Sequence, residues 1–234
     1  MNLYGKQGDV KAFAGSLYGM NPKSIISYPA KFDCDFGKGL FVMDGKVANE
    51  KFNNHAVLDI SGYTTTSKDI IANVNGVTIP TLTTTGTIAT DAATLAVSIN
   101  ENVDGVTASA TSANKVAIVS DSGKGLTATL SYDGSDVTES KVSYTSDYTY
   151  CGVAVFHQVS YMHCRGMYPK GEIVGCVNDG AIWVTLANSV TPTDCANAYV
   201  KADGTFTTES SGNTLAGKFR GSVSDGLAIV DLNK

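Results

Sequence analysis

The stretch 173–186 reads IVGCVNDGAIWVTL, and it decides the fold class that we expect for this chain. Two apolar runs, 173–177 and 181–186, stand on either side of the dipeptide Asp179-Gly180. Asp-Gly dipeptides supply the positive φ angles that tight turns between antiparallel strands require. The stretch therefore predicts two short strands joined by a hairpin turn at Asp179-Gly180.

The same combination of a short apolar run and a turn dipeptide recurs along the chain. Further strand-sized runs lie at 153–161, 198–201 and 227–232. The other turn dipeptides are Asp44-Gly45, Asn75-Gly76, Asp104-Gly105, Asp133-Gly134, Asp203-Gly204 and Asp225-Gly226. Such spacing is typical of an all-β sandwich or barrel. We therefore expect a mainly β protein whose outer domain is a β-sandwich or a barrel-like sheet.

The composition narrows the partners that the protein can have. Charged residues make up only 17% of the 234 residues, whereas about a quarter is usual, and hydrophobic residues make up 43%. The formal net charge is −5, so the chain has no cationic surplus to neutralise a phosphate backbone. Nucleic acid is therefore not an expected partner.

Membrane insertion and export are not expected either. The first eight residues, MNLYGKQG, lack the basic and then apolar run of a secretory signal, and no stretch approaches the ~18 apolar residues of a membrane helix. The cysteines are odd in number and form no CxxC pair. They are Cys34, Cys151, Cys164, Cys176 and Cys195. This pattern favours free thiols and assembly in a reducing cytoplasm.

The first 30 residues differ from the rest of the chain. Tyr4, Phe13 and Tyr18 are scattered among closely spaced glycines, and Pro29 opposes a central strand. We expect 1–30 to be an extended N-terminal arm that becomes ordered against a partner, with Tyr4, Phe13 and Tyr18 as the contact residues. The alternative is an ordinary frayed terminus.

The segment 67–145 contains no Cys, His, Trp or Phe and includes the one convincing helix. Thr90 or Asp91 can cap this helix, Leu95 and Ile99 fall on one face, and Asp104-Gly105 follows its end. Strands are expected around it at 70–79, 106–110, 115–120 and 126–132. We therefore expect a small α+β domain at 67–145, inserted between two parts of the outer β domain at 31–66 and 146–234.

The residues that could carry chemistry do not form a convincing site. His157 and His163 would share one face of a strand, but they would lie roughly 20 Å apart, with Cys164 on the opposite face. The stretch 122–125, SGKG, lacks the ending of a phosphate-binding loop. Trp183 is expected to be a packing anchor. We expect no catalytic residue, no cofactor and no metal, and a hydrolase is disfavoured.

The segment 146–234 resembles the capsid cement (decoration) proteins of tailed phages. The resemblance rests on YPKGE at 168–172, VNDGAIWV at 177–184, AYV at 198–200 and GLAIVDL at 226–232, in this order. It implies a structural, non-enzymatic protein that is assembled in the host cytoplasm and binds the major capsid protein on the outer surface of the virion. It also implies a symmetric oligomer, with a homotrimer as the first choice and a dimer as the second.

A second resemblance concerns the middle of the chain. NVNGVTI at 73–79, TLAVSIN at 94–100 and GVTAS at 105–109 are similar to the insertion module of flagellins and hook proteins. That resemblance implies a surface-displayed domain without catalysis. The competing function is a surface adhesin or a carbohydrate-binding module, which the Thr- and Ser-rich insert and the 11 tyrosines permit.

Overall fold

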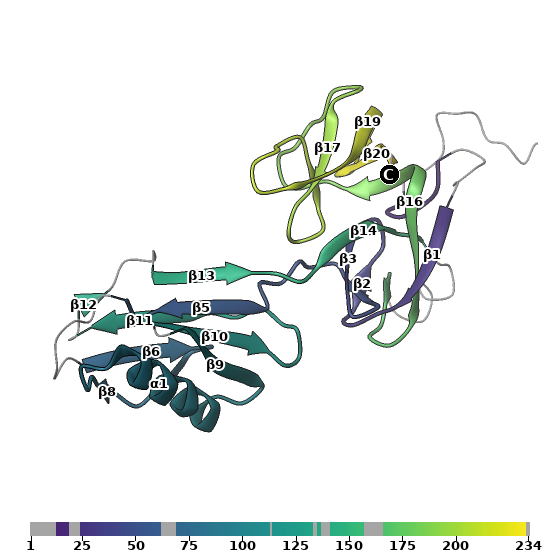
Figure 1. Cartoon of the computed structure of the whole chain (residues 1–234). Coiled ribbons are helices and arrows are strands. Elements are labelled where there is room, and N and C mark those ends of the chain that lie inside the picture. The colour runs from purple at the N-terminus through teal and green to yellow at the C-terminus, as the bar shows by residue number, and fades with distance from the viewer. Residues whose placement is uncertain are drawn as a thin grey trace, which may run out of the picture. The chain divides into compact units, whose positions relative to one another are not determined.

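The computed structural model describes residues 13–18, 24–61, 69–112, 114–132, 135–136, 141–156 and 166–232. The protein is mainly β, as the sequence predicts, with 52% of the described residues in strands and 8% in helix. The chain forms two compact units, shown in Figure 1. Unit 1 comprises Met1–Lys51 and Tyr148–Lys234, and unit 2 comprises Phe52–Asp147.

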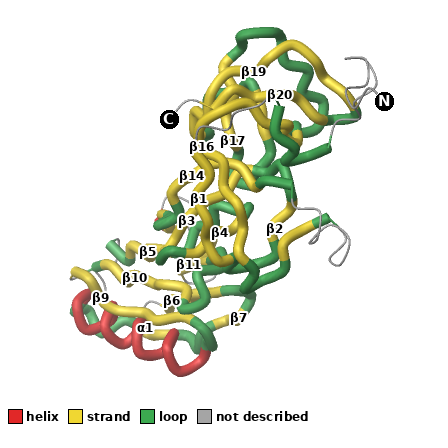
Figure 2. The backbone as a smooth tube through the Cα atoms, turned by 90° about the vertical axis from the view of Figure 1, so that its right-hand side faces the viewer, coloured by secondary structure: helices red, strands yellow, loops and turns green. Residues whose placement is uncertain are grey.

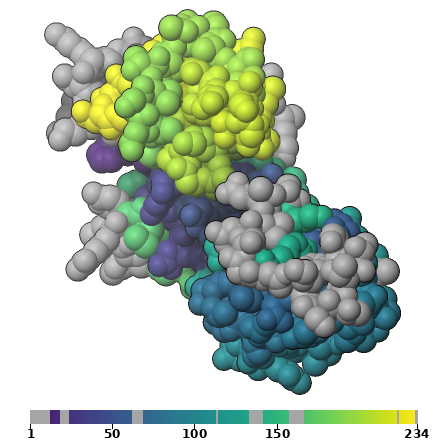
Figure 3. All heavy atoms as spheres, turned by 90° about the vertical axis from the view of Figure 1, so that its left-hand side faces the viewer, coloured from purple at the N-terminus to yellow at the C-terminus, as the bar shows by residue number. Residues whose placement is uncertain are grey.

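Unit 1 is built on one curled sheet. Its strands, in spatial order, are β18 (Phe206–Thr207), β17 (Asn197–Val200), β19 (Thr214–Ser224), β20 (Leu227–Leu232), β16 (Ile173–Thr185), β14 (Thr149–Ala154), β3 (Gly39–Met43) and β4 (Lys46–Ala48). β1 (Ser24–Pro29) pairs with β16, and β2 (Cys34–Asp35) pairs with β15 (Met167–Tyr168). The two separate stretches of unit 1 therefore lie side by side, purple to blue against green to yellow in Figure 3.

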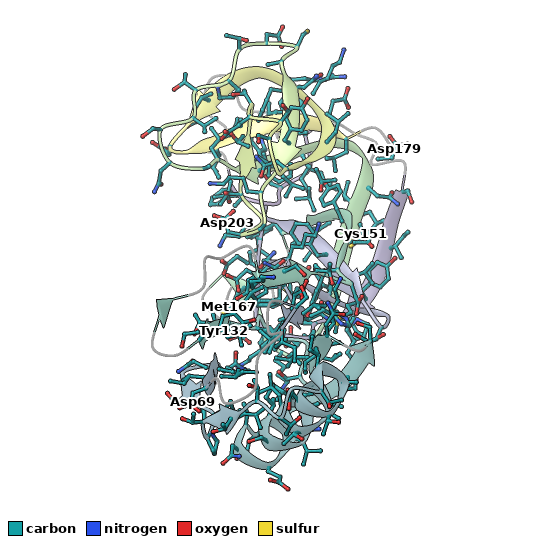
Figure 4. All side chains as sticks on the ribbon, turned by 60° about the vertical axis from the view of Figure 1, so that its left-hand side comes forward. Asp69, Tyr132, Cys151, Met167, Asp179 and Asp203 are labelled. Carbon is teal, nitrogen blue, oxygen red and sulfur yellow. The ribbon has the colours of Figure 1, made fainter. Side chains whose placement is uncertain are left out.

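The long strand β16 corrects the hairpin expected at Asp179-Gly180. The chain does not turn back there but continues as one strand of 13 residues. Its first part pairs with β1 and β14, and its second part, from Gly180 onward, pairs with β20. Gly180 has a φ of 119°, which lets the strand pass from one half of the sheet to the other at this point (Figure 4 labels Asp179).

Other turn dipeptides behave as predicted. Asp44-Gly45 joins β3 to β4 and Asp225-Gly226 joins β19 to β20, with positive φ at both residues of each pair. Asn75-Gly76 does the same in unit 2, between β6 (Asp69–Val74) and β7 (Val77–Thr78). Two positive φ angles in succession define the turn whose twist matches that of the flanking strands. Asp133-Gly134 lies outside the described residues.

Unit 2 contains two sheets and a helix around one core. The first sheet has the order β13 (Val142–Thr145), β5 (His55–Asp59), β10 (Lys115–Ser120), β9 (Val106–Ser112). The second has the order β12 (Ser135–Asp136), β11 (Ala128–Tyr132), β6 (Asp69–Val74), β7 (Val77–Thr78), with β8 (Leu82–Thr83) also on β6. The helix α1 (Ile88–Asn102) lies along the strands, red in Figure 2, and strands from both sheets contribute to the shared core.

The start of α1 differs from the expected cap. The helix begins at Ile88 with Thr87 in the N-cap position, so Thr90 and Asp91 lie inside it. Asp91 is buried, and its Oδ1 accepts hydrogen bonds from the backbone N–H and the hydroxyl of Thr85, at 3.0 and 2.8 Å. The carboxylate therefore holds the loop before the helix and does not cap the first turn. Leu95 and Ile99 are buried together, as the helical spacing predicts.

The ends of unit 2 are joined to each other. The Asn54 side chain donates to Asp147 Oδ2 at 3.1 Å and accepts from the Asp147 backbone N–H at 3.0 Å. The hydrogen bond from His55, together with that from Asn54, lowers the pKa of Asp147. The segment 67–145, which the sequence predicts to be an inserted domain, lies within this unit. β5, which falls in the expected segment 31–66, pairs with β10 and β13 of unit 2.

We propose that unit 2 is an independently folding insertion. Replacing 52–147 by a short Gly/Ser linker should leave unit 1 folded, because the replaced segment begins and ends at hydrogen-bonded neighbours and loop closure depends only weakly on length. Trp183, the single tryptophan, lies in unit 1, so its fluorescence reports the unfolding of that unit alone. A cooperative transition like that of the full chain is expected. A gradual change in fluorescence without a transition would contradict independence.

Candidate functional site

The described part of the N-terminal segment, 13–18, lies on unit 1. Gly15 N–H donates to Trp183 O at 2.7 Å, Trp183 N–H donates to Ser16 O at 2.9 Å, and Tyr18 N–H donates to Ala181 O at 2.8 Å. Leu17 forms an antiparallel bridge with Ile182. This part of the expected arm is therefore bonded to β16 of its own chain, whereas the sequence favoured ordering against a partner.

Gly15 makes this docking possible. Its φ is 76°, and a Cβ atom at this position would lie 2.6 Å from Ala154 O and 2.7 Å from Phe156 N. Both are backbone atoms, which cannot move aside as the end of a flexible side chain can. Only glycine lets the segment approach this closely.

The aromatic side chains of the segment remain half-exposed. Phe13 is 49% exposed and its ring centroid lies 6.0 Å from that of Phe156. Tyr18 is 44% exposed and meets Trp183 edge to face at 6.4 Å. Trp183 itself is buried, as a packing anchor should be. Phe13 and Tyr18 thus each keep one side against their own unit and one side open, while Tyr4 lies outside the described residues.

A shallow apolar groove of about 330 Å³ begins at Phe13. It is lined by Phe13, Ala14, Asp35, Phe36, Lys38, Phe156, Gly166 and Thr185. Phe36 stands edge to face with Phe156 at 5.3 Å, and Lys38 pairs with Asp35 at 2.8 Å. Apolar rings with one ion pair suit an uncharged side chain of another protein better than a charged ligand.

Several exposed apolar residues of unit 1 were missed at the sequence level. They are Ile25, Ile26, Ile173, Leu215 and Val223. Ile25 and Ile26 lie on β1, within the segment expected to be an arm. Pro29 stands at the end of this edge strand, where its missing N–H costs no hydrogen bond. Two adjacent β-branched residues before that proline were the available signal for such a strand.

The described residues contain no cluster of side chains suited to metal binding. Among them no three His, Cys, Asp or Glu side chains lie close enough to hold a metal ion. Burial raises the pKa of the Cys34 thiol to about 12, so it stays protonated near neutral pH and is a poor nucleophile. The candidates His157, His163 and Cys164 lie outside the described residues. No helix in the described ranges has the length and hydrophobicity to cross a membrane.

Unit 2 has a larger groove of about 580 Å³. It is lined by Asn73, Thr127, Ala128, Thr129, Leu130, Val142 and Tyr144. The Tyr144 hydroxyl accepts from the Ala128 N–H and donates to the Ala128 carbonyl, both at 2.9 Å, so that β13 is tied to β11 across the groove. The lining mixes hydroxyl, amide and apolar groups.

Comparison with known proteins identifies the class to which this chain belongs. A family model described as "Structural cement protein (E217 gp24/Pam3 gp6)" matches residues 84–233, which is more than half of the chain. The chain therefore belongs to this family of phage structural cement proteins. The match begins within unit 2 and runs through the C-terminal strands of unit 1. The resemblance of the middle segment to the flagellin and hook module stays a prediction.

The chain was also compared with solved structures and with curated proteins. A solved structure from Mycobacterium phage Patience aligns with 99% of this chain and 94% of its own, at 13% sequence identity and a TM-score of 0.28. None of the curated proteins matches this chain.

Proposed function

We propose that this protein binds the lattice of major capsid proteins on the outer surface of the phage head and stabilises the particle without catalysis. The observation that carries the proposal is the match to the structural cement family over 84–233. The half-exposed aromatic residues Phe13 and Tyr18 support it, because they are held on a β framework and each leaves one side of its ring open. Assembly in the host cytoplasm belongs to the same proposal.

The direct test is binding to particles stripped of the protein. Purified protein should co-sediment with stripped particles and saturate at a fixed number of copies per capsid protein, because a lattice offers a fixed set of equivalent sites. Unsaturable binding, or equal binding to intact and stripped particles, would contradict the proposal. The oligomers implied by the resemblance, a homotrimer or a dimer, remain proposals that a mass measurement in solution distinguishes.

The aromatic contact residues give a prediction of their own. Phe13→Ser combined with Tyr18→Ser should weaken binding to stripped particles by roughly tenfold or more, because each half-exposed ring would lose about 1 kcal/mol of apolar burial. Val97→Ser, an exposed apolar position on α1 of unit 2, is the matched control and should bind like the parent. Equal binding of the double variant and the parent would show that these rings do not contact the capsid.

The groove in unit 2 supports a second candidate function, carbohydrate binding by a surface adhesin. Its mixture of hydroxyl and amide groups beside Tyr144 suits a neutral sugar better than an ion. A glycan array probed with the full chain tests this candidate. Binding that is lost in Tyr144→Ala and kept in the matched variant Tyr199→Ala would favour the adhesin. Binding to no glycan would count against the adhesin and leave cement as the single candidate function.

A further inference from the structure

β1 is an edge strand of unit 1. Its residues pair antiparallel with β16, with Ile25 opposite Val177 and Ser27 opposite Gly175. Within the described residues, β1 pairs with no strand other than β16 (Figure 1). Among the described residues, nothing pairs with its other hydrogen-bonding edge.

The register shows which backbone groups face outward. Ala30, which directly follows β1, donates its N–H to the carbonyl oxygen of Glu172, which directly precedes β16, at 2.7 Å. Ala30 therefore directs its N–H toward the side of β16. In an antiparallel pair, alternate residues point the same way. Ile26 and Tyr28 therefore bond to β16, whereas Ile25 and Ser27 direct their N–H and C=O groups away from it.

The other side of β16 gives the same answer independently. Gly175, which stands opposite Ser27, accepts a hydrogen bond from Val155 N–H at 2.9 Å on the side away from β1. Gly175 and Ser27 therefore form a pair that exchanges no hydrogen bonds. Pro29 belongs to the outward series, where its missing N–H costs nothing.

The regular part of this edge, between Ile25 and Tyr28, has no charged side chain to guard it against pairing. Natural edge strands are commonly guarded by lysine or by inward-pointing charges, but Ser24–Pro29 contains no charged residue. Ile25 is 48% exposed and Ile26 is 41% exposed. A register shift between Ser24 and Ile25 limits the regular edge at one end, and Pro29 limits it at the other.

We propose that β1 pairs antiparallel with β1 of a second copy of this chain, across a two-fold axis at Ile26. Only outward-pointing residues can exchange hydrogen bonds, so Ile25 must face Ser27 of the partner subunit, and Ser27 must face the partner's Ile25. This register satisfies the N–H and C=O groups of both residues in both copies. It also places Ile26 opposite the partner's Ile26, where two β-branched side chains pack against each other.

A second copy fits this edge for two physical reasons. The strand is uncharged, so two copies bring no like charges together. A two-fold pairing uses the same edge on both copies and leaves neither open, which closes the assembly at a dimer. Of the two oligomers left open above, the edge of β1 thus supports the dimer. Two short paired strands bury less surface area than the roughly 1,000 Å² or more of a typical stable interface. The isolated dimer should therefore dissociate on dilution.

Sedimentation velocity over a range of concentrations tests the pairing in solution. The parent should shift from monomer toward dimer as its concentration rises. Ser27→Pro removes an N–H that β16 does not use, so it should abolish the shift and move the melting temperature by only a few degrees. Leu215→Ser, an exposed apolar position on β19, is the control and should dimerise like the parent.

Cysteine cross-linking tests the register in a Cys164→Ser, Cys195→Ser background, because the other cysteines, Cys34, Cys151 and Cys176, are buried. In the proposed register the Cα atoms of residue 25 and of the partner's residue 27 lie about 5.5 Å apart, within disulfide range. A mixture of Ile25→Cys and Ser27→Cys should therefore cross-link under mild oxidation. Each variant alone should cross-link far less, because like residues lie diagonally about 7–8 Å apart.

The outcomes separate this inference from the capsid function, since both measurements use the isolated chain. A concentration-dependent dimer that Ser27→Pro abolishes, together with cross-linking in the mixture alone, supports the pairing. A trimer, a dimer that Ser27→Pro leaves intact, or a monomer that does not cross-link overturns it. Cross-linking of residue 27 only to a capsid protein on particles also overturns it, because another chain would then occupy the edge.

Discussion

Particles stripped of this protein should release their genome at a lower temperature than intact particles, and adding the purified protein back should restore the higher temperature. A cement protein of the proposed kind acts through contact area between neighbouring capsid subunits. Each contact is weak alone, but it forms at a high effective concentration once the neighbouring subunits are fixed in the lattice. The measurement is a thermal ramp of the particles with a dye that fluoresces on released DNA.

The controls separate contact from chemistry. Re-decoration should need no cofactor, and a chelator should leave the release temperature unchanged. The Phe13→Ser, Tyr18→Ser double variant should restore less of the lost temperature than the parent at equal concentration. Equal release temperatures for stripped and re-decorated particles would sink the cement function, and the adhesin would then become the better candidate.

Gly152→Ala should cause a large loss of stability in unit 1. Gly152 has a φ of 152°, and a Cβ there would lie 2.3 Å from Val177 O and 2.6 Å from Cys176 Sγ. The residue lies where the register between β14 and β3 shifts, so β14 cannot move away from β16 without disturbing β3. We expect a loss of about 3 kcal/mol or more in the free energy of unfolding.

Trp183 fluorescence during thermal or urea unfolding measures this loss in unit 1. Gly45→Ala is the matched control, because Gly45 also has a positive φ, 71°, but a Cβ there would meet no atom within 4 Å. It should cost only about 1–2 kcal/mol, from the left-handed conformation alone. If the two variants were equally stable, the close approach of Gly152 to β16 would not limit the stability of the unit.

Local sequence patterns predicted the turns and the class of the fold well. Asp44-Gly45, Asn75-Gly76 and Asp225-Gly226 form the expected hairpins because both of their residues adopt positive φ, which is a local property. Leu95 and Ile99 revealed the buried face of α1 for the same reason. Asp179-Gly180 has the same local chemistry, yet it lies inside β16, because pairing with β1, β14 and β20 decides the path of the chain there.

The candidate site was only partly predictable, because its geometry depends on tertiary contacts. The sequence singled out Phe13 and Tyr18 as aromatic residues among glycines. It could not show that Gly15 fits against the backbone of Ala154 and Phe156, which are more than a hundred positions away. The strand at 24–29 falls in the segment expected to be an arm, because its pairing with β16 depends on residues far along the chain. Asp91 was mistaken for a cap, because its partner Thr85 precedes the helix.

The continuity of β16 has a mechanical consequence. The two halves of the curled sheet in unit 1 share this one strand, so a tension applied to either half passes to the other along covalent peptide bonds. The hydrogen bonds between β16 and its antiparallel neighbours are then loaded in shear, many at the same time. No single side-chain contact has to resist the tension alone. A strand shared in this way suits a protein whose surroundings expand under pressure from within.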